Sequence, residues 1–233
     1  MRAILVNEFG SLKNAELGTI DKPFVRPGEL LIEIHATAAN FVDILLIGGM
    51  HQSKPRLPYI PGKGPAGIVR TVGEGVINFV VGDRVLAMCE PGGGFAEFVA
   101  TPATMCHRIP DKLSFSESAS MALIYDTAWF ALLARGCFHP GESVLVLGAT
   151  GGVGQATIQL VKALGGVALA AVSDFSKVDM VNDAGADFVI DIAREDLRES
   201  LREQVFETSD GKGVDIVVDA LGDKFFEAAI RAV

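Results

Sequence analysis

A short apolar stretch that ends in a glycine-dense turn constrains this chain more than any other feature. Residues 144–147 read Val-Leu-Val-Leu, and the turn from Gly148 to Gly154 then opens into an apolar-faced segment at 156–164. A buried strand, a glycine turn and a helix in this order form the pattern that binds the pyrophosphate of a dinucleotide. The glycines let the backbone approach the ligand closely, and the helix N-terminus offers unpaired N–H groups to the phosphate oxygens. We therefore expect a dinucleotide-binding turn at this point of the chain.

The glycine triplet departs from the usual G-x-G-x-x-G at its first position, since it reads Ala149, Gly151 and Gly154. Glycine-rich strand–helix turns also occur without a ligand, so the motif alone leaves a purely structural turn as the alternative. The sequence beyond the turn favours the dinucleotide reading, because apolar strands keep alternating with helices, which is typical of a parallel sheet covered on both faces. We expect strands at 167–172, 188–190 and 214–219, and helices at 176–184 (begun by a capping box of Ser176 and Asp179), 195–207 and 225–233.

The first half of the chain has a different pattern. Residues 29–36 alternate around an apolar core, as a half-buried strand does. Further short strands are expected at 67–72, 84–88 and 95–99, separated by turns rich in glycine and proline. This pattern predicts a small antiparallel β-barrel or sandwich, which a helix at about 116–133 joins to the α/β part.

The fold class is therefore α/β, with two expected domains at 1–120 and 121–233. A doubly wound dinucleotide fold normally has six strands, and only four are expected in the second domain. The fifth and sixth strands of such a fold would lie beyond Val233, so we expect the second domain to be incomplete at its C-terminal end.

Composition limits the class of protein. The 233 residues are 49% hydrophobic and carry a net charge of −9, which argues against nucleic acid as the main partner. No apolar run reaches the roughly 18 residues of a membrane helix, and the N-terminus does not have the pattern of a signal peptide. The cysteines, Cys89, Cys106 and Cys137, have no metal or redox spacing and predict reduced thiols. We expect a cytoplasmic enzyme without a membrane segment.

Several motifs in the same order resemble the zinc-independent quinone oxidoreductases of the medium-chain dehydrogenase/reductase superfamily. The resemblance implies a GroES-like barrel, a Rossmann domain, a cleft between them that holds nicotinamide, and a homodimer when the chain is full length. The motifs are Ala39–Asp43, Leu57–Gly62, Gly64–Val69, Val72–Val76, Val81–Val85, Gly94–Phe98, Ala149–Gly154 and Gly213–Asp219.

The same comparison bears on metal binding. Zinc-dependent relatives have a cysteine where Asn40 stands and Gly-His-Glu where Gly62, Lys63 and Gly64 stand. Asparagine, lysine and glycine cannot form a catalytic Cys/His zinc site, and the four histidines have no mutual metal spacing, so we expect no metal. Without a Lewis acid, reduction of an electron-poor acceptor such as a quinone or enone is favoured over alcohol oxidation. The family often has a tyrosine near the substrate where Leu45 stands and one near the adenosine phosphate where Ile192 stands. The first departure weakens the inference of quinone specificity, and the second weakens the inference of the cofactor without reversing it.

The expected catalytic residues are Asn40, which could hydrogen-bond a substrate carbonyl or the nicotinamide ribose, and Lys63, which could place a positive charge near a developing oxyanion. The alternatives are a barrel-turn asparagine and a solvated turn lysine. Thr127 resembles the family threonine near the nicotinamide, with an ordinary helix-interior threonine as its alternative. The expected cofactor-binding residues are Asn40, Thr127, Ala149, Thr150, Gly151, Gly152, Val153, Gly154, Ser173, Lys177, Leu221 and Gly222.

The expected cofactor is NADPH. An NAD site usually ends its second strand with a carboxylate that binds the ribose 2′-hydroxyl, whereas Val172 ends this strand. Ser173 and Lys177 then offer a hydroxyl and a cation to a 2′-phosphate. Asp174 lies in the same loop and is the alternative, as a ribose ligand, although the phase of the strand favours an outward direction for it.

We therefore expect an NADPH-dependent reductase that delivers hydride to a quinone or an α,β-unsaturated carbonyl, a small-molecule acceptor, without zinc. Two alternatives stay open. One is an enoyl-thioester reductase, since the same hydride delivery reduces an activated alkene. The other is a cofactor-binding protein with little catalysis, in a structural or RNA-associated role.

Overall fold

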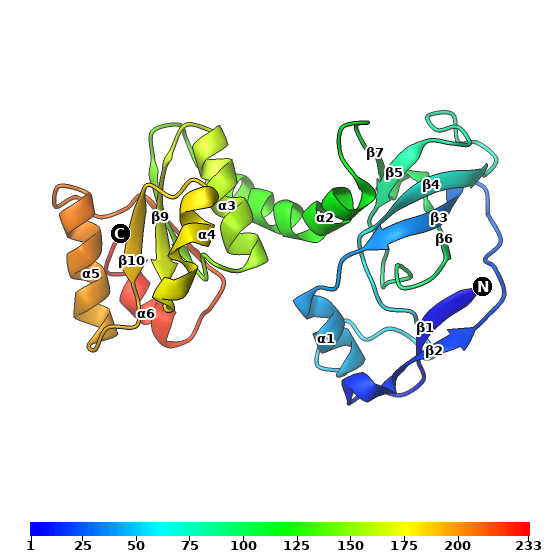
Figure 1. The fold of residues 1–233 in the computed structure, drawn as a ribbon, viewed down its shortest axis with the longest axis horizontal. Coiled ribbons are helices and arrows are strands. Elements are labelled where there is room, and N and C mark those ends of the chain that lie inside the picture. The colour runs from blue at the N-terminus through cyan, green and yellow to red at the C-terminus, as the bar shows by residue number, and fades with distance from the viewer. The chain divides into compact units, whose positions relative to one another are not determined.

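The computed structural model describes residues 1–233, and the chain forms two compact units, Met1–Leu123 and Ile124–Val233. The boundary falls inside helix α2 (Phe115–Trp129), which a π-helical segment, η3 (Phe130–Arg135), continues. Each unit has its own sheets and its own apolar clusters (Figure 1).

The first unit is built on a five-stranded antiparallel sheet with the strand order β6-β3-β4-β5-β7 and on a separate hairpin of β1 and β2. One short helix, α1, follows the central strand β3. The elements are β1 (Arg2–Val6), η1 (Leu12–Asn14), β2 (Ala15–Thr19), β3 (Glu29–Thr37), α1 (Phe41–Ile47), β4 (Pro65–Val72), β5 (Arg84–Ala87), β6 (Phe98–Pro102), η2 (Ala103–Met105) and β7 (Cys106–Arg108).

Side chains alternate between the two faces of β3, and Leu30 and Ile32, which point to the same face, are fully buried in the core of this sheet. Val69 of β4 and Val85 of β5 pack into the same cluster. At Gly67 the strands approach so closely that a Cβ atom would lie 2.0 Å from the Glu33 carbonyl oxygen, so only glycine fits there.

The second unit is a four-stranded parallel sheet with the order β10-β9-β8-β11. This order, in which the first strand is central and the fourth lies on its other side, is that of the doubly wound dinucleotide fold. The elements are β8 (Ser143–Leu147), α3 (Gly152–Ala163), β9 (Val167–Val172), η4 (Phe175–Lys177), α4 (Val178–Asp183), β10 (Phe188–Asp191), α5 (Leu197–Thr208), β11 (Ile216–Asp219) and α6 (Lys224–Ala229).

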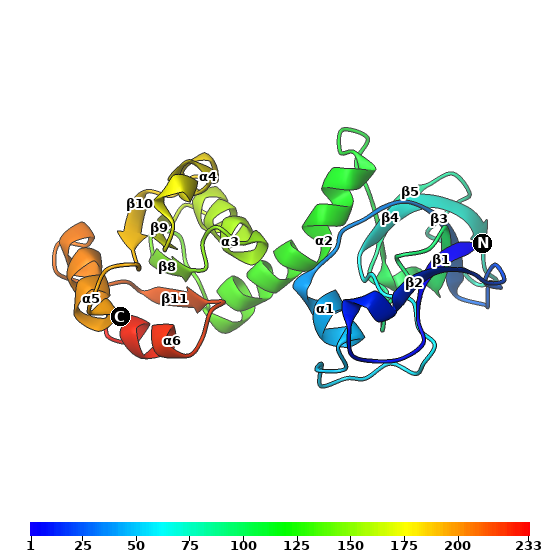
Figure 2. The same cartoon turned by 60° about the horizontal axis from the view of Figure 1, so that its bottom comes forward.

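Both faces of this sheet are covered, as Figure 2 shows with α3 and α4 on one side and α5 and α6 on the other. Successive residues of β8 supply the two cores: Val144 and Val146 pack with α3 and α4, whereas Leu145 and Leu147 pack with α5 and α6. All four side chains are fully buried. A strand that is apolar on both faces, as the sequence predicts, therefore positions the glycine turn that follows it.

The expected fold class is confirmed, and most expected strands lie within two residues of the observed ones. Two local expectations are wrong. The strand expected at 95–99 is β6, Phe98–Pro102. The expected capping box of Ser176 does not form, because the N–H and the hydroxyl of Ser176 both donate to the Asp174 carboxylate, and α4 begins after a turn of 3₁₀ helix.

Candidate functional site

The glycine turn between β8 and α3 has the backbone that close approach of a ligand requires. Gly148 has φ of +71°, where a side chain is disfavoured. The Gly151 N–H donates to the Gly148 carbonyl at 3.0 Å, which closes the turn. Ala149, which replaces the first glycine of the motif, is fully buried, whereas Gly151 and Gly152 are exposed at the start of the helix.

Two glycines of this turn have different physical roles. A Cβ atom on Gly154 would lie 2.3 Å from the Gly148 oxygen and 2.7 Å from the Ala149 Cα, so glycine is required for the helix to pack against the strand end. A Cβ atom on Gly151 would meet only the Gly148 oxygen, at 3.3 Å, a contact that is tight by a few tenths of an ångström. Gly151 and Gly152 are exposed at the N-terminus of a 12-residue helix, where unpaired N–H groups can bind an anion.

The loop after β11 lies beside this turn. Leu221 and Gly222 donate their N–H groups to the Asp219 carboxylate at 2.8 and 2.9 Å, which fixes the loop as it leaves the strand. The Leu221 side chain lies 3.3 Å from the position of a Cβ on Gly148. The structure thus brings the expected residues Ala149, Thr150, Gly151, Gly152, Val153, Gly154, Leu221 and Gly222 to one region of the sheet edge.

The loop after β9 starts at the same edge of the sheet and carries Ser173, which is exposed, and Lys177. The Lys177 ammonium lies 3.7 Å from the Asp174 carboxylate, and both side chains are about half exposed. The Ser176 hydroxyl and N–H that bind Asp174, together with nearby Lys177, hold the pKa of Asp174 below its usual range. The ionised Asp174 carboxylate therefore lies next to Lys177, the residue expected to bind the 2′-phosphate, and would repel that phosphate.

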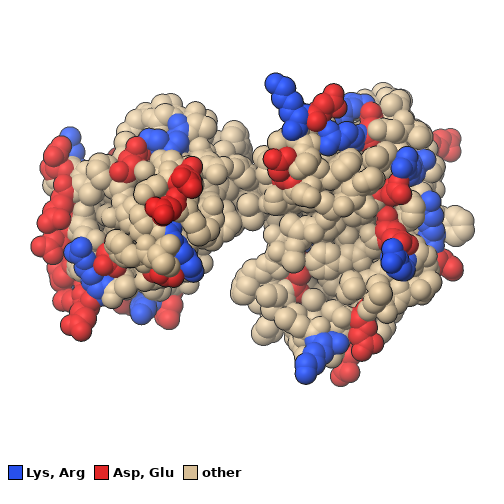
Figure 3. Space-filling view, viewed as in Figure 1, with Lys and Arg blue, Asp and Glu red and all other residues tan.

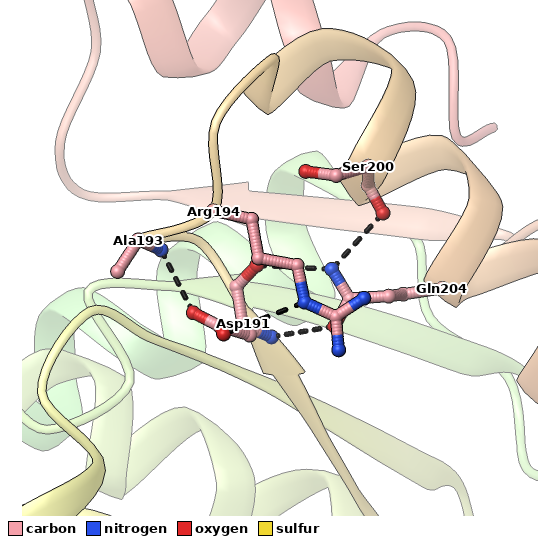
Figure 4. Close-up of polar contacts among 5 residues, drawn as sticks. All are labelled: Asp191, Ala193, Arg194, Ser200 and Gln204. Atoms are coloured by element: carbon pink, nitrogen blue, oxygen red, sulfur yellow. Dashed lines mark hydrogen bonds and ion pairs between the residues drawn. The ribbon is translucent and has the colours of Figure 1, made fainter.

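The end of the neighbouring strand β10 is held by a polar cluster around Asp191 (Figure 4). The Gln204 side chain of α5 accepts from the Asp191 N–H at 2.8 Å and donates to the Asp191 carbonyl at 2.9 Å. The Asp191 carboxylate accepts from the Ala193 N–H and lies 3.4 Å from Nε of Arg194. Because Asp191 is in register with Val172 of β9, this cluster fixes the loop that runs next to Ser173.

Thr127 lies in α2 and its residue is exposed. It belongs to the second unit, in which Ile124 of the same helix lies 3.1 Å from the position of a Cβ on Gly152. The start of the second unit therefore contacts the glycine turn.

In the first unit, Asn40 precedes α1, and the buried Asp43 connects it to a second segment. The Asp43 carboxylate accepts from the Asn40 N–H at 2.8 Å through one oxygen and from the Gly62 N–H at 2.9 Å through the other. The Asn40 amide donates to the Ala38 carbonyl at 3.2 Å. One buried carboxylate thus holds both segments that carry the expected catalytic residues.

Lys63 follows Gly62 and is buried, with 9% of its side chain exposed, so the alternative of a solvated turn lysine is wrong. Its Nζ lies 2.6 Å from Oε1 of Glu90, whose side chain is 62% exposed. The Lys63 carbonyl accepts from the Cys89 N–H at 2.7 Å, so the two segments are joined by backbone as well as by charge.

Three further groups of the first unit are shielded from water. Burial, followed by the Asp43 carboxylate, raises the pKa of Tyr59 to about 12, and the Tyr59 hydroxyl has no hydrogen-bond partner. Burial also raises the pKa of the Cys89 and Cys106 thiols to about 12 each. These groups therefore stay neutral at ordinary pH.

No group of three or more His, Cys, Asp and Glu side chains in residues 1–233 has an arrangement that could hold a metal ion. None of the helices has the length and the apolar character needed to span a membrane. Acidic side chains gather on the second unit over α5 (Figure 3), where Glu199, Glu203 and Glu207 follow one another at helical spacing. This face would repel a phosphate backbone.

The sequence position of Asp43 indicates a structural role for it, whereas nothing in the sequence points to the other residues that hold the site together: Glu90, Asp191, Gln204 and Asp219. Their partners lie elsewhere in the sequence, up to 27 residues away for Lys63 and Glu90. An acid three residues after Asn40 was the one visible signal, since that spacing is typical of the carboxylate of a capping box.

Comparison with known proteins agrees with this architecture. The family described as the alcohol dehydrogenase GroES-like domain matches residues 26–111, and the family described as zinc-binding dehydrogenase matches residues 152–233. A quinone oxidoreductase-like protein 2 homolog from Nematostella vectensis is 33% identical over all of this chain and 62% of its own length. The quinone oxidoreductase of Sus scrofa is 35% identical over 96% of this chain and 67% of its own length. The chain thus spans about two thirds of the length of these curated relatives.

Solved structures are similar over the whole chain. A mycobacterial protein in complex with NADPH has a TM-score of 0.89 at 33% identity and is covered over 71% of its chain. An NAD-dependent alcohol dehydrogenase has a TM-score of 0.92 at 30% identity, with 74% covered, and the CurK enoyl reductase has 0.89 at 26% identity, with 70% covered. The fold and these relatives define a medium-chain dehydrogenase/reductase. Within that superfamily, the chain belongs to the zinc-independent quinone oxidoreductase-like family.

Proposed function

We propose that this protein is an oxidoreductase that uses NADPH to reduce a quinone or an α,β-unsaturated carbonyl without zinc. The observation that carries the proposal is the glycine turn at the start of α3, where Gly151 and Gly152 are exposed and Gly154 is packed against the strand end. A turn that needed glycine only for packing would show the second feature without the first.

The chain's own residues would bind and orient a nicotinamide dinucleotide, which supplies a hydride when bound. The first N–H groups of α3, at Gly152 and Val153, would bind the pyrophosphate. The loop at Leu221 and Gly222 would line the same region, and Thr127 is the proposed residue for the nicotinamide end.

In the first unit, Asn40 and Lys63 are the proposed catalytic residues. Asn40 has an amide that can donate to a carbonyl oxygen of the acceptor, and Asp43 fixes its backbone. Lys63 has an ammonium that can stabilise the oxyanion formed when a quinone or an enone accepts hydride. Residues 1–120 would thus act as the catalytic domain and residues 121–233 as the cofactor-binding domain.

NADPH is preferred to NADH in this proposal because Ser173 and Lys177 can donate to a 2′-phosphate, and a mycobacterial structural relative was solved with NADPH. Asp174 is the counter-argument, since its carboxylate lies 3.7 Å from Lys177 and a related structure is of an NAD-dependent enzyme. The proposal therefore requires Lys177 to turn from Asp174 to the phosphate, a short move for an exposed side chain.

A second candidate is reduction of an enoyl thioester, which the similarity to an enoyl reductase favours. Both candidates require an activated alkene or quinone as hydride acceptor. We also propose a homodimer when the chain is full length, and a cytoplasmic location, since the three cysteines are unpaired, as in a reducing compartment.

The experiment is an acceptor profile followed by NADPH absorbance. Steady oxidation of NADPH with 1,2-naphthoquinone or an enone supports the first candidate, and oxidation with crotonyl-CoA supports the second. Tight cofactor binding without turnover on any of these acceptors would contradict both and would favour a binding protein.

A further inference from the structure

We propose that Glu90 is a positioning residue that orients the Lys63 ammonium, so that Lys63 delivers a proton to the oxyanion formed on the acceptor. The inference rests on the proposed function for its substrate class. It starts from an unusual asymmetry, in which the Lys63 side chain is 9% exposed and the Glu90 side chain is 62% exposed.

A buried lysine needs an explanation because the loss of hydration costs several kcal/mol per ion even after relaxation. The contact of 2.6 Å between Lys63 Nζ and Glu90 Oε1 offsets part of that cost. An apolar side chain of similar length would fill the same space without the cost of desolvating a charge. A contribution to folding stability therefore does not explain why an ion pair is present here.

Backbone hydrogen bonds already join the two segments without the charges. The Gly94 N–H donates to the Gly62 carbonyl at 2.8 Å, and the Cys89 N–H donates to the Lys63 carbonyl at 2.7 Å. The ion pair is therefore not needed to bring residues 61–64 and 89–95 together, and its charge is available for another role.

The position of the pair connects it to the candidate site. Asp43 binds the Gly62 N–H, next to Lys63, and the Asn40 N–H. The single buried carboxylate thus ties the lysine segment to the segment of the other proposed catalytic residue. The exposed Glu90 carboxylate thus connects the buried Lys63 ammonium to the solvent.

Hydride transfer would break the C4–H bond of the reduced nicotinamide, form a C–H bond on an enone or an O–H bond on a quinone, and leave an electron pair on the acceptor oxygen as an enolate or a quinolate. A Lys63 N–H bond breaks and its proton bonds to that oxygen. The neutral amine then regains a proton from water, directed by Glu90. The net reaction consumes NADPH, the acceptor and one proton, and yields NADP⁺ and the reduced acceptor.

The test compares Lys63→Met, Glu90→Gln and a matched control, Glu97→Gln, on the purified protein. Glu97 is also a glutamate of the first unit in an ion pair, with Arg2 at 2.9 Å, and has no proposed role in the site. We expect Lys63→Met and Glu90→Gln to lower kcat at least tenfold and to enlarge the solvent isotope effect, while KM for NADPH stays within twofold. Glu97→Gln should leave all three quantities within twofold of wild type.

Two readouts do not depend on turnover. 4-Nitrophenol is a probe for an oxyanion, and the wild type should bind its phenolate form at least tenfold more tightly than either site variant. An NMR signal from a slowly exchanging lysine ammonium should be present in the wild type and absent in Lys63→Met. Nitrophenolate affinity equal in all variants, or Glu90→Gln with wild-type kcat and isotope effect, would overturn the inference.

A merely structural pair would behave differently. Glu90→Gln would then lower the melting temperature and the cofactor affinity together, with kcat changed only in proportion to folded protein, and that result would also overturn the inference. Failure of the proposed function is distinguishable, because a wild type with no turnover on quinones, enones or enoyl thioesters would contradict it whatever nitrophenolate binding shows.

Discussion

Substitution of Gly151, just before α3, and of Gly154, in its first turn, should separate ligand binding from folding. At Gly154 a Cβ atom would lie 2.3 Å from a carbonyl oxygen, about 1 Å closer than an ordinary contact of roughly 3.4 Å. The neighbours are backbone atoms of the turn and cannot move aside as a flexible side chain could. Overpacking of this kind costs about 1–3 kcal/mol, and the helix preference of alanine over glycine returns up to about 1 kcal/mol.

We therefore expect Gly154→Ala to lose about 2 kcal/mol of unfolding free energy, which corresponds to roughly 10 °C in the melting temperature of a unit of about 100 residues. Gly151 has φ of −81° and ψ of 169°, values that valine adopts readily, and a Cβ atom there would meet only the Gly148 oxygen, at 3.3 Å. Gly151→Val should stay within about 3 °C of wild type but lower the affinity for the cofactor at least tenfold, about 1.4 kcal/mol.

The assay combines a thermal melt with a fluorescence titration of NADPH for each variant. An unchanged dissociation constant in Gly151→Val would show that the turn is only structural. A Gly154→Ala variant as stable as wild type would refute the packing argument for the third glycine.

Four further predictions concern the thiols, the pH dependence of stability, the loop after β9 and the absence of zinc. Cys137 is exposed, so one thiol per chain should react with a disulfide reagent at pH 8 and three after denaturation, since Cys89 and Cys106 are buried. The pKa values of Cys89, Cys106 and Tyr59 are raised in the folded state. The stability that these neutral groups contribute should therefore be complete below about pH 9 and lost as the pH rises toward 12. A denaturation midpoint that does not change over that range would contradict this. Lys177→Ala should raise KM for NADPH several-fold with little effect on KM for NADH. Asp174→Asn, which removes the negative charge beside Lys177, should lower KM for NADPH. A wild type that uses NADH better than NADPH would make Asp174 the ribose ligand. Purified protein should hold no stoichiometric zinc, and elemental analysis giving about one zinc per chain would contradict this.

Local pattern was enough to predict the second unit. The strand at 167–172 is β9 itself, and the glycine turn lies between a buried strand and a helix as expected. These features can be predicted because the apolar runs and the glycine spacing that determine them lie within a single strand–turn–helix segment. They also fix which residues reach the carboxyl edge of the sheet.

The first unit was harder to predict because its site depends on contacts between distant residues. Helix α1 has seven residues, too short to stand out as a periodic pattern, and is begun by a bond from Asn40 to Asp43. The burial of Lys63 depends on a carboxylate 27 residues further on. Such pairs are set by how strands and loops fold back on one another, which composition and spacing do not reveal.

The central claim is direct hydride delivery from a nicotinamide to the acceptor. The measurement that tests it most directly is mass spectrometry of the product formed from an enone and NADPH with deuterium at C4. We predict one deuterium at the β-carbon of the saturated product, from one face of C4 only, in protein that contains no metal. A product without deuterium, or deuterium transfer that depends on added zinc, would contradict the account.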